Sequence, residues 1–269
     1  MSNKKIFLII YNQLLLIFGM LCLGINVIHC SAEPTRKILP YKSAMINYSK
    51  PIKFSIYLPE SDDQTDKYPV LYLLHGQSQD EKIWDQMGIK EIADHLISTG
   101  CISPLVIVMP REEAYMEKIS ESDFGNRIIN ELIPYVESNF PVLTDPASRA
   151  IGGISRGALW AQKIAFNHYG TFGLLGQHSL PAAVFSDYVI YRIYADSEGK
   201  IPLMKIRIDS GTEDPYLKGA LAFSKQLADV KAPYMLVIEP GGHDPEYWKE
   251  HLEDYLIWYA DNLKNPADD

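Results

Sequence analysis

The sequence predicts an α/β fold in which helices cover both faces of a mostly parallel central sheet. From Ile52 onward, short runs rich in Val, Ile, Leu and Tyr alternate with longer segments whose apolar residues recur at helical spacing. This is the pattern of strands joined by crossover helices. Several runs are continuously apolar, as strands covered on both faces must be. No internal repeat or low-complexity tract interrupts the alternation, so we expect one domain over residues 33–269.

The expected strands are bounded by turn residues and enriched in β-branched and aromatic side chains. They are Lys53–Leu58, Val70–Leu74, Leu105–Met109, Arg149–Ile154, Phe172–Leu175, Lys205–Asp209 and Tyr234–Ile238.

Helices are expected between these strands. One covers residues 89–97 and stops at Gly100, a residue that accepts the left-handed backbone of a helix end. A second covers 124–140, and Pro134 inside its apolar stripe should kink it or lie near its first turn. In the last helix Asp244 can act as the cap, and its aromatic stripe is expected to pack in the core.

The first 32 residues have the layout of a secretory signal peptide. Lys4 and Lys5 precede an apolar stretch, Ile6–Ile28. This stretch is also long enough for an uncleaved membrane anchor. We therefore expect a secreted or periplasmic protein, or one anchored through its leader.

Composition excludes several classes of partner and cofactor. The net charge of −9 argues against nucleic-acid binding, which needs a basic surface. Cys101 is the one cysteine outside the leader, so no disulfide is expected within the domain. The chain has no His-Glu-x-x-His, no paired cysteine motif and no lysine in a glycine-rich turn before a helix, so we expect neither a metal nor a nucleotide cofactor.

A candidate nucleophile lies in the pentapeptide Gly-Ile-Ser-Arg-Gly, residues 153–157. It directly follows an expected strand and directly precedes a helical segment. A serine on so tight a turn has a strained backbone that exposes its hydroxyl, and the flanking glycines avoid clashes with neighbouring elements. The motif in this setting predicts that Ser155 is a nucleophile.

A serine hydroxyl needs a histidine to take its proton and a carboxylate to orient that histidine. On this kind of scaffold the chain order is serine, acid, histidine. His243 fits, because it lies in a glycine loop after the last strand. The other histidines after Ser155 lie in or at the end of helices (His168 and His251) or precede any plausible acid loop (His178).

The acid is expected in the loop after the penultimate strand, which offers Asp209, Glu213 and Asp214. Asp209 still belongs to the strand end. We predict Asp214 as the acid, with Glu213 as the rival. The competing interpretation of Asp214 is a helix cap before Pro215, since the segment that follows is also helical in pattern.

The oxyanion that forms on an attacked carbonyl needs preorganised N–H donors. We assign them to the backbone N–H groups of Arg156, the residue after the serine, and of Gln77, in the loop after an early strand. His75 and Gly76 are expected to shape that loop.

Further segments combine with these motifs into one pattern over residues 41–263: Phe54–Pro59, Tyr68–Gly76, Trp84, Glu131–Val136, Gly211–Asp214, Gly241–Asp244 and Trp248. In these residues the chain resembles the esterase D and enterochelin esterase-like branch of the α/β-hydrolases, which includes feruloyl esterases and mycolyltransferases. The separations between Ser155, Asp214 and His243 fit a feruloyl-esterase-like layout.

The resemblance implies an α/β-hydrolase fold with little or no cap, and hydrolysis of a carboxylic ester through an acyl-enzyme without a cofactor. It implies substrate contacts for Trp84, Tyr115 and Trp248, because Met109–Tyr115 lies where relatives place part of the cleft. Two acids there, Glu112 and Glu113, could disfavour anionic acyl groups or form a solvated loop.

The expected substrate is a small or polysaccharide-linked ester: an acylated carbohydrate, an aryl ester of the feruloyl type or a siderophore-like ester. The elbow lacks the Ser-Met-Gly-Gly of formylglutathione hydrolases, and a leader would be misplaced on a cytosolic enzyme, so that activity is not favoured. Two alternatives remain open: an acyltransferase of the mycolyltransferase type, and a non-catalytic carbohydrate-binding protein on the same scaffold.

Overall fold

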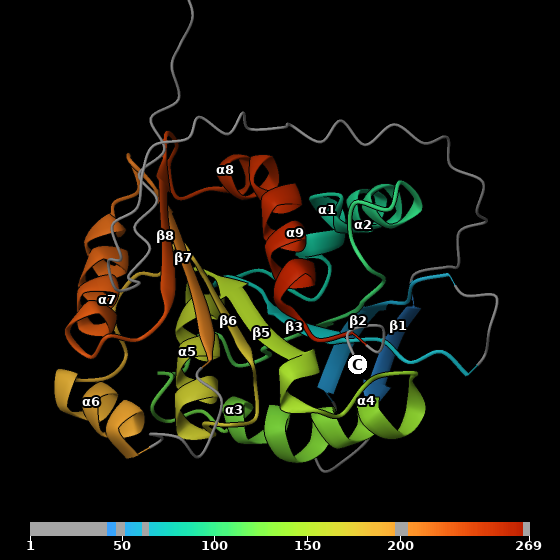
Figure 1. The fold of residues 1–269 in the computed structure, drawn as a ribbon, viewed down its shortest axis with the longest axis horizontal. Coiled ribbons are helices and arrows are strands. Elements are labelled where there is room, and N and C mark those ends of the chain that lie inside the picture. The colour runs from blue at the N-terminus through green and yellow to red at the C-terminus, as the bar shows by residue number, and fades with distance from the viewer. Residues whose placement is uncertain (1–41, 47–51, 61–64, 197–203, 266–269) are drawn as a thin grey trace, which may run out of the picture.

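The computed structural model describes residues 42–46, 52–60, 65–196 and 204–265. The predicted leader, residues 1–32, lies outside the described residues. Within them, eight strands form one sheet in the order β1-β2-β4-β3-β5-β6-β7-β8 (Figure 1). The strands are β1 (Lys42–Ile46), β2 (Ile52–Tyr57), β3 (Val70–Leu74), β4 (Val106–Pro110), β5 (Arg149–Ile154), β6 (Leu174–His178), β7 (Lys205–Gly211) and β8 (Tyr234–Glu239).

The sheet is parallel from β4 through β3, β5, β6 and β7 to β8. Only the β1–β2 and β2–β4 pairings, at one edge of the described sheet, are antiparallel. The predicted α/β fold with a mostly parallel sheet is confirmed. In such sheets the carboxyl ends of the strands meet at one edge, where ligands usually bind.

Helices cover both faces (Figure 1). The helices of the described chain are α1 (Ile83–Gln86), α2 (Ile89–Ser98), α3 (Phe124–Arg127), α4 (Ile133–Asn139), α5 (Arg156–Asn167), α6 (Asp187–Asp196), α7 (Leu217–Asp229), α8 (Pro245–Glu250) and α9 (Leu252–Asn262). One apolar cluster packs α1, α2, α8 and α9 against one face of the sheet. A second cluster packs α3, α4, α5, α6 and α7 against the opposite face. Among the described helices, none combines the length and the apolar content needed to cross a membrane.

The helix with the internal proline has a local distortion where the sequence predicts one. A π-helical turn, Ile128–Leu132, separates α3 from α4, and Pro134 lies in the first turn of α4. Proline has no N–H for the helical hydrogen bond and its ring crowds the preceding turn, so the wider π turn accommodates it.

The last helical segment begins as predicted and then divides. The Asp244 carboxylate accepts a hydrogen bond from the Tyr247 N–H at 3.0 Å, and Pro245 follows in the first turn. The segment breaks at His251, so α8 and α9 are separate helices.

Some expected bounds are wrong, and three of the helices and strands given above, β1, α1 and α6, were not expected. β6 runs to His178 rather than stopping at Leu175, and its polar end is buried. β1 and α1 are only five and four residues long, too short for a clear apolar period, whereas Ile190, Ile193 and Tyr194 of α6 recur at helical spacing and pack in the core.

Candidate active site

Ser155 lies at the turn between β5 and α5. Its φ of 52° and ψ of −117° are a strained combination for a residue with a side chain. Its N–H donates to the carbonyl oxygen of His178 at 3.0 Å. A Cβ atom on Gly157 would lie 2.4 Å from the carbonyl oxygen of Leu74, and one on Gly153 would lie 2.7 Å from the same atom. The turn therefore needs both glycines because the end of β3 packs against it.

The structure brings the three predicted side chains into contact. His243 Nε2 lies 2.8 Å from Ser155 Oγ, and His243 Nδ1 lies 2.8 Å from Asp214 Oδ2. The serine hydroxyl can donate to Nε2 when Nδ1–H donates to the carboxylate. This tautomer leaves Nε2 free to accept the hydroxyl proton.

Asp214 serves two partners, one with each oxygen. Its Oδ1 accepts the Tyr216 N–H at 2.7 Å at the start of α7, while Oδ2 faces His243. Asp214 can therefore cap the start of α7 and orient His243 at the same time. The rival, Glu213, is exposed, and its N–H donates to the carbonyl oxygen of Gly241.

Two aromatic rings pack edge-on against the His243 imidazole. The centroid of Trp248 lies 5.3 Å from that of His243, and the centroid of Tyr216 lies at 4.8 Å. Trp248 is 4% exposed and donates its indole N–H to Ser179 Oγ at 3.0 Å, so it supports His243 from inside the protein. Tyr216 is 45% exposed and presents a ring surface beside the histidine. Tyr216 belongs to none of the predicted motifs.

The two segments that carry the predicted oxyanion donors both lie next to Ser155. A Cβ atom on Gly76 would lie 3.6 Å from Ser155 Cβ, so the loop that carries Gln77 runs beside the nucleophile. The Gly76 N–H donates to Gln79 Oε1 at 2.8 Å, which closes the loop. The backbone N–H groups of Gln77 and Arg156 form no hydrogen bond with any residue in the described ranges.

A largely buried ion pair that no sequence pattern indicates connects these two donor segments. The Arg156 guanidinium binds both carboxylate oxygens of Glu112, at 2.7 and 2.6 Å, and also donates to the carbonyl oxygen of Glu117. The Glu112 N–H donates to His75 Nε2 at 2.8 Å. His75 must therefore carry its proton on Nδ1, which donates to the carbonyl oxygen of Gly76 at 2.7 Å.

Burial lowers the pKa of His75 below its ordinary value, and the nearby Arg111 acts in the same direction. The Gly76 carbonyl and the carboxylates of Glu112 and Asp80 oppose this shift without reversing it. A neutral His75 is what the contact with Glu112 requires, because a protonated Nε2 cannot accept the N–H.

Glu112 and Glu113, the two acids that could have disfavoured an anionic acyl group, both have cationic partners. Arg156 neutralises Glu112, whereas Glu113 is exposed and pairs with Arg111 and Lys53. Neither acid presents an unpaired negative charge to a substrate.

The three residues predicted to contact the substrate differ in accessibility. Trp84 is 0% exposed and belongs to the core between α1 and the sheet, so its side chain offers no surface to a ligand. Trp248 is buried as well. Tyr115 is partly exposed in the loop between β4 and α3. No cluster of three or more His, Cys, Asp or Glu side chains in the described part of the chain is arranged to hold a metal ion.

A family model described as "Putative esterase" matches residues 47–259. The chain belongs to this esterase family. The resemblance to esterases of the feruloyl esterase type is confirmed, and the family with its relatives supports a serine esterase.

Two relatives match part of this chain. A protein of Xylanibacter ruminicola named endo-1,4-beta-xylanase/feruloyl esterase is 31% identical over 134 residues, which are 45% of this chain and 18% of that protein. An esterase of Mycobacterium tuberculosis is 35% identical over 131 residues, which are 45% of this chain and 27% of that protein. The matched part is thus less than a third of either relative.

Solved structures share the fold of this chain. A ferulic acid esterase superposes with a TM-score of 0.74 at 23% identity, covering 82% of this chain and 98% of that one. An S-formylglutathione hydrolase from Staphylococcus aureus gives a TM-score of 0.66 at 21% identity, covering 82% and 98%. These similarities establish an α/β-hydrolase fold.

Proposed function

We propose that this protein is a carboxylic-ester hydrolase that works through an acyl-enzyme, with Ser155 as nucleophile, His243 as base and Asp214 as orienting acid. The observation that carries the proposal is the chain of two 2.8 Å contacts that joins the three side chains at a strained strand-to-helix turn. A nucleophile, a base and an orienting group within hydrogen-bonding reach are what acyl transfer requires.

In the first half of the cycle Ser155 Oγ attacks the ester carbonyl carbon, and its proton passes to His243 Nε2. The oxyanion accepts hydrogen bonds from the Gln77 and Arg156 N–H groups. His243 then gives the proton to the departing alcohol, which leaves an acyl group on Ser155.

In the second half a water molecule attacks the acyl carbon and loses its proton to His243. The tetrahedral intermediate collapses, the acid departs, and Ser155 regains its proton. Asp214 stabilises the imidazolium form of His243 in both halves.

The proposed substrate is an aryl ester of the feruloyl type, free or linked to a polysaccharide. Two aromatic side chains with accessible surface support an aromatic acyl group: Tyr216, whose ring contacts His243, and Tyr115, in the loop that Arg156 holds. The xylanase/feruloyl esterase relative and the ferulic acid esterase fold point to the same class of substrate. An acylated carbohydrate and a siderophore-like ester are the other candidate classes.

The test compares the wild-type protein with Ser155→Ala on p-nitrophenyl acetate and methyl ferulate. We expect kcat to fall by about 10⁴-fold or more in the variant, because the covalent step is lost. Ser98→Ala, at a partly exposed serine at the end of α2, is the matched control and should keep wild-type rates. Equal activity in Ser155→Ala and wild type would place the site elsewhere, and inactivity of both would favour the non-catalytic binding protein.

Product analysis with an added alcohol separates hydrolysis from acyl transfer. The hydrolase releases free acid as its main product, whereas a transferase of the mycolyltransferase type forms a new ester.

The proposed location is outside the cytoplasm, and its support is the charged and apolar pattern of residues 1–32. Cell fractionation with N-terminal sequencing tests it. A mature protein that begins near residue 33 supports secretion, an intact N-terminus in the membrane fraction supports anchoring, and an intact cytoplasmic protein contradicts both.

A further inference from the structure

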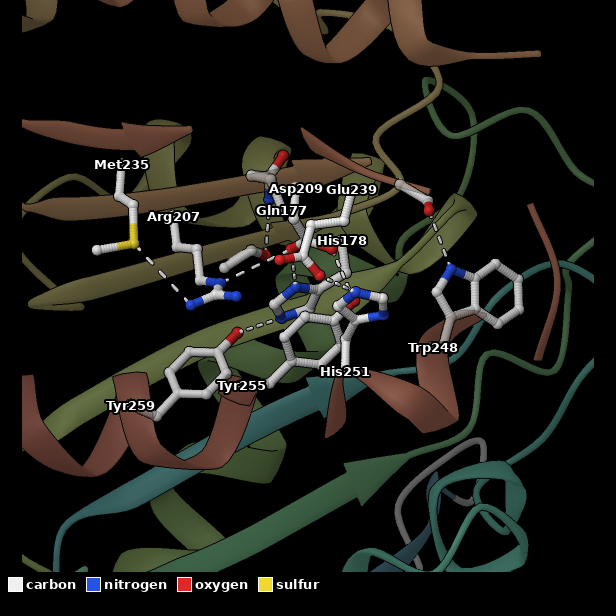
Figure 2. A network of polar contacts seen from close by, with 12 residues as sticks. Gln177, His178, Arg207, Asp209, Met235, Glu239, Trp248, His251, Tyr255 and Tyr259 are labelled. Atoms are coloured by element: carbon white, nitrogen blue, oxygen red, sulfur yellow. Dashed lines mark hydrogen bonds and ion pairs between the residues drawn. The ribbon is translucent and has the colours of Figure 1, made fainter. Parts of the chain in front are cut away.

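A buried polar network centred on His178 and Asp209 takes no part in the chemistry proposed above (Figure 2). His178 at the end of β6 and Asp209 in β7 are paired residues of neighbouring strands. His178 Nδ1 lies 2.5 Å from Asp209 Oδ2, and both side chains are 0% exposed. The pair therefore joins the ends of the two strands from within the core.

Helix α9 completes the network with two tyrosines (Figure 2). The Tyr255 hydroxyl donates to Asp209 Oδ1 at 2.6 Å, and its ring stacks on His178 with centroids 3.8 Å apart. The Tyr259 hydroxyl lies 3.1 Å from His178 Nε2. Each ring nitrogen of the histidine and each oxygen of the carboxylate thus has a polar partner.

The sheet makes room for the Tyr259 hydroxyl by omitting two side chains. Gly152 in β5 and Gly176 in β6 are register partners. A Cβ atom on Gly152 would lie 1.8 Å from the Tyr259 hydroxyl oxygen, and one on Gly176 would lie 1.7 Å from it. The hydroxyl therefore occupies a hollow that any larger pair of residues would fill.

Burial by itself would raise the pKa of Asp209, but the His178 imidazole and its hydrogen bond, together with Arg207 and Tyr255, outweigh burial and hold the pKa below its ordinary value. Asp209 is accordingly an ionised carboxylate in the core. Burying an ion costs several kcal/mol before its partners compensate, and apolar residues of similar size often pack as stably. Attaching α9 to the sheet does not by itself require this charge.

The backbones of the pair connect to the candidate triad on both sides. The His178 carbonyl oxygen accepts the Ser155 N–H at 3.0 Å, and the Asp209 carbonyl oxygen accepts the Ser179 N–H at 2.9 Å. Ser179 has a φ of 52°, and its hydroxyl accepts the indole N–H of Trp248, the ring that packs against His243. One route from the pair ends at the nucleophile and the other at the base.

We propose that His178 and Asp209 are positioning residues, which hold the ends of β6 and β7 so that Ser155 Oγ and His243 Nε2 stay within hydrogen-bonding distance. Neither residue touches the substrate. The inference rests on the proposed function, because it assigns a catalytic consequence to the position of Ser155.

The test measures kcat and KM for p-nitrophenyl acetate per active serine, counted by titration with a fluorophosphonate, beside the thermal midpoint. His178→Leu removes both contacts of the imidazole. His178→Asn restores one, because its side-chain N–H can take the place of Nδ1–H toward Asp209. We expect His178→Leu to lower kcat per titrated serine by about 10- to 100-fold with KM within about twofold, since small misplacements of reacting groups have effects of this size. We expect His178→Asn to recover much of that loss.

Two further variants cover a failure of the leucine protein to fold. Tyr255→Phe removes only one oxygen atom and should lower kcat per titrated serine by a few-fold. Tyr72→Phe is its matched control, because Tyr72 is fully buried in the other core cluster and its hydroxyl has no hydrogen-bond partner among the residues that the structure describes. This control should keep the wild-type kcat.

A lower thermal midpoint with unchanged kcat per titrated serine in His178→Leu and Tyr255→Phe would overturn the proposal and leave the network a purely structural role. Failure of the proposed function looks different, because the wild-type protein itself would then have no titratable serine.

Discussion

The two sides of Ser155 are held by different kinds of contact. On the base side, His243 is 16% exposed and rests on one carboxylate and two rings. On the oxyanion side, Glu112 and Arg156 form a two-point ion pair with side chains 3% and 12% exposed. On the base side each partner makes one contact with His243, whereas on the oxyanion side one ion pair with two hydrogen bonds connects two segments of the chain.

The difference matches what each side must do. In the proposed mechanism His243 gains and loses a proton in every cycle, so its partners must suit both the neutral and the charged ring. Oxyanion donors work by being fixed in advance at the place where charge develops. A buried ion pair provides that fixation, because it resists rearrangement.

The largest effect is expected at the orienting acid. Asp214→Asn removes the charge that supports the imidazolium and the acceptor that sets its tautomer, so we expect kcat to fall by about 10⁴-fold. Steady-state kinetics on p-nitrophenyl acetate measure it. Glu213→Gln is the matched control and should change kcat by less than about twofold, since Glu213 is exposed. A loss confined to the Glu213 variant would assign the acid role to that residue instead.

The next effect tests the ion pair on the oxyanion side. Glu112→Gln keeps the shape of the side chain but removes the charge that fixes Arg156. We expect kcat to fall by about 10- to 100-fold, where the upper figure is the effect of losing one oxyanion donor altogether. Inhibition by a trifluoromethyl ketone, which mimics the tetrahedral intermediate, should weaken in proportion. Glu113→Gln should leave both unchanged. A destabilised Glu112→Gln protein with wild-type kcat would limit the ion pair to folding.

A smaller effect is expected at the indole under His243. Trp248→Phe keeps a ring but loses the hydrogen bond to Ser179, so we expect a decrease in kcat of a few-fold and a loss of about 1 kcal/mol in the free energy of unfolding. Kinetics and urea unfolding measure the two quantities. Trp84→Phe is the control, because Trp84 is also buried on the same face of the sheet and its indole N–H has no hydrogen-bond partner within the described part of the chain. A Trp84→Phe protein with raised KM for methyl ferulate would restore the predicted substrate contact of that residue.

The smallest effect concerns pH and His75. Its folded pKa lies below the unfolded value of about 6.5, so the unfolded chain binds more protons at acidic pH. The stability that neutral His75 contributes is fully present above pH 6.5 and is lost as the pH falls toward the folded pKa. Urea unfolding at pH 8 and pH 5.5 should show a steeper loss in wild type than in His75→Gln. Equal losses would mean that His75 does not contribute to the pH dependence.

Much of the fold was readable because it depends on local pattern. β3 and β5 have the predicted bounds, and the Gly-Ile-Ser-Arg-Gly turn follows from its position between an apolar strand and a helix. Ser155, Asp214 and His243 were each placed by the loop that carries them, and the ends of parallel strands bring those loops to one edge.

The contacts that stabilise the site were not readable. Glu112 meets His75 and Arg156 across 37 and 44 residues of sequence, and a single sequence does not indicate which distant side chains will pair. Gln177 and His178 end the apolar run of β6 and so mimic a strand end, although both are buried. Trp84 and Trp248 lie beside recognisable motifs, which suggested substrate contacts, but both side chains are buried in the core.

The hollow that admits the Tyr259 hydroxyl also constrains how this sequence can diverge. A side chain at position 152 or 176 collides with that hydroxyl, so neither glycine can be replaced while the tyrosine remains. Tyr259 must be replaced before either glycine is, or at the same time. In descendants of this chain the three positions should therefore change as a set, with glycine at both strand positions whenever tyrosine occupies the helix.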